Sequence, residues 1–150
     1  NEMDPDYVVI SEADNFNYDS IVKAMRFVNG GAKLIGTNYD LTGPAEDGLV
    51  PACRALMAPI ELTTGKSAYY VGKPNPLMMR TGLRLLNTHS AETAMIGDRM
   101  DTDIVAGIET GLDPILVLSG ATTRAMMAEY PYRPRLVLNG VGDIVPGAGQ

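Results

Sequence analysis

Along this chain, segments with the hydrophobic pattern of a strand alternate with segments that have the pattern of a helix. Short apolar or β-branched runs predict strands, and apolar residues that recur every three or four positions predict helices. The first part of the chain is predicted to form a strand, a helix and a second strand, in Tyr7–Ile10, Tyr18–Asn29 and Ala32–Thr37. Gly30 and Gly31 end the predicted helix, because glycine is a poor helix former and readily takes the conformations that follow a helix.

After the second predicted strand, the sequence predicts a loop and then a helix. Residues 38–50 are rich in Asn, Asp, Gly and Pro, which predicts a loop. Pro51 can begin a helix, since the first helical turn needs no N–H at that position. That helix is predicted to continue through "ACRALMAPIELTTG", with a kink or break at Pro59.

After Lys66 the alternation becomes regular. Strands are predicted in residues 67–72, 93–97, 114–120 and 135–138, and helices in residues 75–87, 101–111 and 121–130. Such alternation is typical of an α/β fold, with a parallel sheet and helices on both of its faces. A boundary between two lobes is expected in the loop 38–50 or near Gly65, and residues 147–150 are expected to form a loose tail.

Composition narrows the classes of function. The chain has 150 residues and a net charge of −6, with no basic run, which argues against a nucleic-acid or anionic-membrane partner. No apolar stretch approaches the roughly 20 residues that span a bilayer. Cys53 is the single cysteine, so an internal disulfide cannot form and a reducing, cytoplasmic compartment is expected.

Charged residues follow two of the predicted strands. Lys73 comes after "YYVG", and Asp98 comes after "AMIG". We expect these two strands to be buried neighbours, so that both side chains face one crevice at the carboxyl ends of the strands, where α/β folds bind ligands. The lysine suits a phosphate oxygen and the aspartate suits Mg²⁺.

Two more aspartates follow Asp98 closely. Asp101 and Asp103 fall in the first turn of the predicted helix, where the helix dipole favours negative charge. Asp101 is interpreted as a surface residue that pairs with Arg99, and Asp103 as a residue that orients Asp98 or Lys73.

The paired motifs resemble those of a known family. "YVGKPNP", "IGDRMDTDIVAGIETGL" and "ILVLSG" are similar to the third and fourth motifs of haloacid dehalogenase (HAD) superfamily phosphatases of the NagD-like, 4-nitrophenylphosphatase type. "GTNYD" followed by "GLVPACRAL" resembles the cap domain of that subfamily where it returns to the core. The resemblance implies a partial cap in residues 1–64 and the C-terminal half of a HAD-type core in residues 65–150.

The resemblance also implies a chemistry and a set of roles. Such enzymes use Mg²⁺ and an aspartate nucleophile to hydrolyse small phosphate monoesters through an aspartyl-phosphate. Asp98 would bind Mg²⁺. Lys73 and Asp103 would be the catalytic pair: Lys73 would hold the phosphate and the nucleophile in place, and Asp103, a carboxylate of the same motif as Asp98, would orient them. Asn38 and Asp40 in the cap would contact the leaving group, although both are also common turn formers.

The first motif of the family is missing from the sequence, and so is its second motif, a strand that ends in Ser or Thr before the cap. The nucleophile lies in D-x-D-G after a strand, and neither Asp4-Pro5-Asp6 nor Asp101-Thr102-Asp103 fits that context. We therefore expect this chain to be the C-terminal fragment of such a phosphatase. The alternative is a non-catalytic binding module that forms a homodimer through the cap. A receiver-like domain with Asp98 as the phosphate acceptor is disfavoured, because the acidic pair expected after its first strand is absent.

Two further residues have ordinary interpretations. His89 is expected in an exposed turn, and Cys53 is expected to be a packed small residue rather than a nucleophile.

Overall fold

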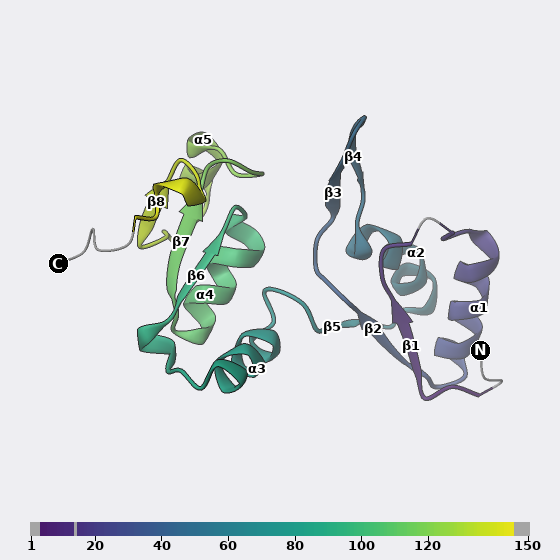
Figure 1. Cartoon of the computed structure of the whole chain (residues 1–150). Coiled ribbons are helices and arrows are strands. Elements are labelled where there is room, and N and C mark those ends of the chain that lie inside the picture. The colour runs from purple at the N-terminus through teal and green to yellow at the C-terminus, as the bar shows by residue number, and fades with distance from the viewer. Residues whose placement is uncertain (1–3, 14, 146–150) are drawn as a thin grey trace. The chain divides into compact units, whose positions relative to one another are not determined.

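The computed structural model describes residues 4–13 and 15–145, and it divides the chain into two compact units (Figure 1). Unit 1 comprises Asn1–Gly72, and unit 2 comprises Lys73–Gln150. The boundary between the two units lies eight residues after the one that the family resemblance implies, because residues 65–72 belong to unit 1. The tail expected at residues 147–150 lies outside the described part of the chain.

Unit 1 contains a parallel sheet, two helices and a hairpin. Its elements are β1 (Tyr7–Ile10), α1 (Tyr18–Asn29), β2 (Lys33–Gly36), β3 (Thr42–Ala45), β4 (Gly48–Pro51), α2 (Cys53–Thr64) and β5 (Tyr69–Tyr70). The sheet has the order β1-β2-β5, and both pairs are parallel, with Val9 opposite Ile35 and Ile35 opposite Tyr69. The carboxyl ends of the three strands therefore lie at one edge.

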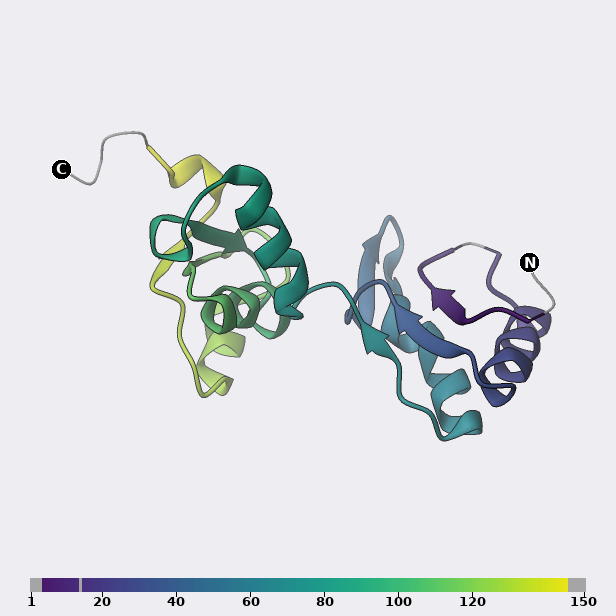
Figure 2. The same cartoon turned by 90° about the horizontal axis from the view of Figure 1, so that it is seen from below.

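Helices α1 and α2 pack on the same face of this sheet, as Figure 2 shows. The helices bury apolar residues at helical spacing, and these contact alternate residues of the strands. The core of unit 1 consists of Val8, Ala24, Val28, Leu34, Met57 and Ile60. We predicted a kink or a break at Pro59; the residue lies inside α2 without ending it, so there is no break, and the kink stays a prediction.

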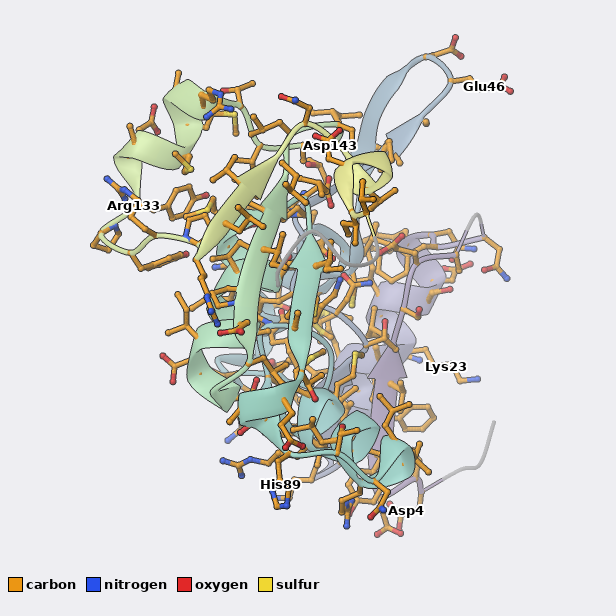
Figure 3. The ribbon with its side chains drawn as sticks, turned by 60° about the vertical axis from the view of Figure 1, so that its left-hand side comes forward. Asp4, Lys23, Glu46, His89, Arg133 and Asp143 are labelled. Atoms are coloured by element: carbon orange, nitrogen blue, oxygen red, sulfur yellow. The ribbon has the colours of Figure 1, made fainter. Side chains whose placement is uncertain are left out.

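The predicted loop over residues 38–50 is wrong for its second half. Strands β3 and β4 pair antiparallel as a hairpin, and Glu46 lies at its tip (Figure 3). Gly48 follows the two turn residues with φ of +125°, a conformation that favours glycine. The hairpin was missed because its strands bury no apolar face: every residue of β4 is exposed. Backbone hydrogen bonds define it, and a hydrophobic pattern cannot reveal them.

Unit 2 contains the second sheet. Its elements are α3 (Pro76–Leu86), a 3₁₀ turn (Ser90–Glu92), β6 (Ala94–Gly97), a π-helical turn (Met100–Ile104), α4 (Val105–Thr110), β7 (Asp113–Val117), α5 (Arg124–Glu129), β8 (Leu136–Leu138) and a 3₁₀ turn (Val141–Asp143). The strands have the order β6-β7-β8, all parallel. The α/β class with parallel strands that we predicted is confirmed.

The packing of unit 2 centres on β7 and on the turn that follows β6. Met100, Ile104 and Leu116 are almost fully buried, and Met127 of α5 and Tyr132 pack around them. Burying a side chain of this size contributes roughly 1.5–3 kcal/mol. The residues next to Asp98 in sequence are thus anchored by the core of this unit.

One predicted strand lies in a different sheet from the one expected. Strand β5, before Lys73, pairs with β2, whereas β6, before Asp98, pairs with β7. The expectation that these two strands are buried neighbours is wrong, and Tyr69 in β5 is exposed. A two-residue aromatic strand carries no pattern that specifies its partner, which explains the error.

Candidate functional site

The centre of the candidate site is an ion pair in unit 2. The Lys73 ammonium lies 2.6 Å from Oδ1 of Asp103 and donates a hydrogen bond to it. The Asp103 side chain is 4% exposed, whereas the Lys73 side chain is 37% exposed. A buried carboxylate needs such a partner, because removing a charge from water is costly. The lysine therefore neutralises the aspartate and keeps part of its surface open to solvent.

The second oxygen of Asp103 organises the loop after β6. Oδ2 accepts hydrogen bonds from the backbone N–H groups of Asp98 and Arg99, both at 3.1 Å. A Cβ atom at Gly97 would lie 2.3 Å from three atoms of the Asp103 side chain, so only glycine allows this approach. Asp103 thus connects Lys73 to the backbone that carries Asp98.

The Asp98 carboxylate is held from the other side. Its Oδ2 accepts a hydrogen bond of 2.7 Å from the backbone N–H of Ala121. The backbone carbonyl oxygen of Asp98 accepts a hydrogen bond from the Thr122 N–H. In the part of the chain that the structure describes, no hydrogen-bond donor reaches Asp98 Oδ1. That oxygen is available for a ligand, and Asp98 is partly exposed.

The π-helical turn after Asp98 is fixed by two long-range hydrogen bonds. Met100 N–H donates to Thr122 Oγ1 at 3.3 Å, and Met100 O accepts from the Tyr132 hydroxyl at 3.0 Å. Single π turns at a helix start are frequent at functional sites. This turn places Asp103 inward, and it places Asp101 at the surface.

The structure therefore brings together three of the predicted site residues. Lys73 and Asp98 both interact with Asp103, the first by its ammonium and the second by its backbone N–H. Lys73 and Asp98 are thus linked through Asp103 and not, as we had expected, by the pairing of the strands that precede them. The roles of the three residues in binding phosphate and metal remain predictions.

Asn38 and Asp40, the two predicted contacts of the leaving group, lie in unit 1. They follow the carboxyl end of β2, and Asn38 Nδ2 donates to Glu12 Oε1 at 2.8 Å. Asn38 Oδ1 accepts from Asp40 N–H at 3.1 Å, which is the short-range bond typical of an Asx turn. Both residues thus serve in turn geometry, and substrate contact stays a prediction.

Sequence reasoning missed a stack of side chains beside this turn. The Arg54 guanidinium lies 4.1 Å from the centre of the Tyr39 ring, which in turn meets Tyr70 edge-on at 4.9 Å. Tyr70 donates a hydrogen bond to Glu61, and burial together with that carboxylate raises the pKa of Tyr70 to about 12. The ring hydroxyl stays neutral at physiological pH. Only the three-dimensional fold brings these residues together, so the sequence offered no signal for the stack.

The loop after β7 was also missed. Ser119 to Thr122 supplies the N–H groups that hold Asp98, and backbone donors leave no mark on the side-chain pattern. The available signal was positional: the loop follows a parallel strand next to β6, so it lies at the same edge as Asp98.

Three residues with ordinary interpretations behave as predicted. The Arg99 guanidinium donates two hydrogen bonds to the Asp101 carboxylate, from Nε to Oδ1 at 3.2 Å and from Nη2 to Oδ2 at 3.0 Å. Cys53 is fully buried as a free thiol and donates to Ile10 O. His89 is exposed at the amino end of β6, away from the strand end that carries Asp98 (Figure 3).

The donor chemistry of the site fits Mg²⁺ in part. Among the residues that the structure describes, no group of three or more His, Cys, Asp or Glu is placed to hold a metal ion. Mg²⁺, however, is commonly bound by one or two carboxylates together with water and substrate phosphate. Asp98, with one carboxylate oxygen free of donors, fits the role of one such ligand.

Comparison with known proteins identifies the family. The family model described as HAD-hydrolase-like matches residues 70–144, which include the cluster of Lys73, Asp98 and Asp103. The chain belongs to the HAD-hydrolase-like family.

Named relatives of this HAD-family chain are phosphatases. It is 43% identical over 143 residues to a dihydroxyacetone phosphatase of Corynebacterium glutamicum, covering 95% of this chain and 52% of that protein. It is 41% identical over 143 residues to the ribonucleotide monophosphatase NagD of Escherichia coli, covering 95% and 56%. The chain thus spans about half the length of the curated relatives it matches.

Solved structures show the same likeness. The NagD structure from E. coli K-12 superposes with a TM-score of 0.85 at 40% identity, covering 95% of this chain and 56% of that one. A 4-nitrophenylphosphatase from Thermotoga maritima gives a TM-score of 0.89 at 33% identity, covering 95% and 55%. The resemblance to NagD-like, 4-nitrophenylphosphatase-type HAD phosphatases is confirmed.

Within the described residues, none of the helices has the length and apolar character needed to cross a bilayer.

Proposed function

We propose that this chain forms part of a Mg²⁺-dependent phosphatase that hydrolyses small phosphate monoesters. The observation that carries the proposal is the cluster in which Asp103 joins Lys73 to the backbone of Asp98. Phosphoryl transfer is catalysed chiefly by positioning and by neutralising charge, and this cluster supplies a fixed cation and a fixed carboxylate. The names of the relatives, which include a dihydroxyacetone phosphatase and a ribonucleotide monophosphatase, support the substrate class.

Each residue has a role in this proposal. Lys73 holds a phosphate oxygen through the exposed part of its ammonium, and Asp103 fixes the direction in which that ammonium points. Asp98 contributes Oδ1 to Mg²⁺. When bound, the metal supplies positive charge that neutralises the phosphate oxygens. Asn38 and Asp40 contact the leaving group.

The covalent step needs a group that this sequence does not contain. In the proposed reaction an aspartate attacks phosphorus, the leaving-group oxygen departs, and water then hydrolyses the aspartyl-phosphate. The D-x-D-G motif that would supply the nucleophile is absent from these 150 residues. We therefore propose that activity belongs to a longer protein that contains this chain. Within this chain the single cysteine is a free thiol, and we propose a cytoplasmic setting on that ground.

An assay of the full-length protein tests this function. Hydrolysis of 4-nitrophenyl phosphate, dihydroxyacetone phosphate, a sugar phosphate and a ribonucleoside monophosphate would be measured with MgCl₂ and with EDTA. We expect turnover of at least one ester with Mg²⁺, loss of turnover with EDTA, and no turnover by the 150-residue chain alone.

The same assay separates the alternative function. A non-catalytic module that dimerises through the cap would hydrolyse none of the esters in either buffer. Light scattering would then report a stable dimer. Absence of Mg²⁺-dependent hydrolysis in the full-length protein would end the phosphatase proposal.

A further inference from the structure

The loop that follows β7, Ser119 to Thr122, contacts the Asp98 side chain; we call it the β7 loop. A Cβ atom added at Gly120 would lie 2.1 Å from Asp98 Oδ2, 2.5 Å from its Cγ and 2.6 Å from its Cβ. Such distances are far shorter than any ordinary contact between heavy atoms. Rotation of the Asp98 side chain cannot relieve them all, because its Cβ is fixed by the backbone.

The β7 loop also determines which Asp98 oxygen is free. Ala121, the residue after Gly120, donates its N–H to Oδ2 at 2.7 Å, and Thr122 donates its N–H to the Asp98 carbonyl oxygen at 3.1 Å. Thr122 is itself buried and accepts from Met100 N–H. The loop is thus fixed to the core at one end and to the Asp98 carboxylate at the other.

We propose that the β7 loop, through Gly120, is a positioning element that limits Asp98 to one-oxygen coordination of a divalent cation. Because Oδ2 accepts the Ala121 N–H, Oδ1 is the oxygen that the loop leaves to bind the cation. Mg²⁺ accepts one oxygen per carboxylate in a small octahedral shell, whereas Ca²⁺ takes six to eight oxygens and often both from one carboxylate. The site therefore selects Mg²⁺ over Ca²⁺, an inference that rests on the proposed function.

The first test uses the unaltered full-length protein. Isothermal titration calorimetry with MgCl₂ and with CaCl₂ measures the two affinities directly. We expect Mg²⁺ to bind about 10-fold or more tightly than Ca²⁺. Equal or tighter binding of Ca²⁺ would contradict one-oxygen coordination, and no binding of either ion would instead contradict the proposed function.

The second test substitutes the glycine in the full-length protein. Gly120→Ala should weaken Mg²⁺ binding by about 10- to 100-fold, the usual effect of disturbing a group that orients a metal ligand. The concentration of Mg²⁺ that gives half-maximal hydrolysis should rise by a similar factor, while the KM for the ester at saturating Mg²⁺ changes little. Gly142→Ala is the matched control, because a Cβ atom there meets nothing within 4 Å.

A double-mutant cycle separates the clash from general damage, and it needs no metal. Gly120→Ala should lower the midpoint of thermal unfolding by about 5 °C or more. In an Asp98→Gly background the clashing side chain is gone, so the same substitution should have little effect. Equal effects in both backgrounds would show that Gly120 does not act through Asp98, as would Mg²⁺ affinity unchanged by Gly120→Ala.

Discussion

At the scale of single residues, the site depends on Asp103, a buried carboxylate with three hydrogen-bond donors. One donor is the Lys73 ammonium and two are backbone N–H groups of the loop after β6. The side chain that looks central in the sequence, Asp98, is thus positioned by a neighbour five residues away. Hydrogen bonds to a charged group are stronger than neutral ones, so this arrangement holds the loop in one conformation.

Removing the ammonium should therefore cost stability as well as activity. Lys73→Met leaves the buried Asp103 carboxylate without its cation, and we expect a loss of about 1–3 kcal/mol in the free energy of unfolding. Urea denaturation of the 150-residue chain measures this loss. Lys66→Met, at an exposed lysine of unit 1, serves as the control. Equal stability of the two variants would mean that the ion pair contributes nothing to the fold.

At the scale of elements, the sequence predicted the helices and strands whose apolar residues follow a helical or strand period. In the structure, side-chain oxygens of Asn75 and Thr123 cap α3 and α5, and α5 therefore begins three residues later than the helix predicted from residue 121. The hairpin β3–β4 and the pairing of β5 with β2 were not predictable, since backbone pairing determines both. The motifs in the sequence indicated the charged side chains of the candidate site. They did not indicate the close contacts at Gly97 and Gly120 or the hydrogen bond from the Ala121 N–H.

Helix α3 allows a direct test of local helix preference. Gly82 lies within α3, and a Cβ atom there would meet nothing within 4 Å. Alanine loses less backbone entropy than glycine on folding, so Gly82→Ala should stabilise the chain by about 0.5–1 kcal/mol. Urea denaturation checks the value. A destabilised variant would reveal that Gly82 packs closely against another surface.

At the scale of the whole molecule, the chain has two cores, one for each unit. Ile60 lies fully buried in the first and Leu116 fully buried in the second. Each unit thus carries its own hydrophobic cluster, and both residues of the candidate ion pair belong to unit 2.

Two matched substitutions test this separation. Ile60→Ala and Leu116→Ala should each cost about 2–5 kcal/mol in the unit that contains the residue. Hydrogen exchange followed by peptide mapping should show lost protection in residues 4–72 for the first and in residues 73–145 for the second. Loss of protection throughout the chain in either variant would show instead that the units unfold together.

The central claim is that Asp98 carries the metal-dependent step of a phosphatase. The most direct measurement is hydrolysis of 4-nitrophenyl phosphate by full-length Asp98→Asn across a Mg²⁺ titration, with circular dichroism to verify the fold. An asparagine oxygen can still accept from Ala121 N–H, so the fold should persist while turnover falls by about 100-fold or more. A Mg²⁺ response like that of the unaltered protein would contradict the account.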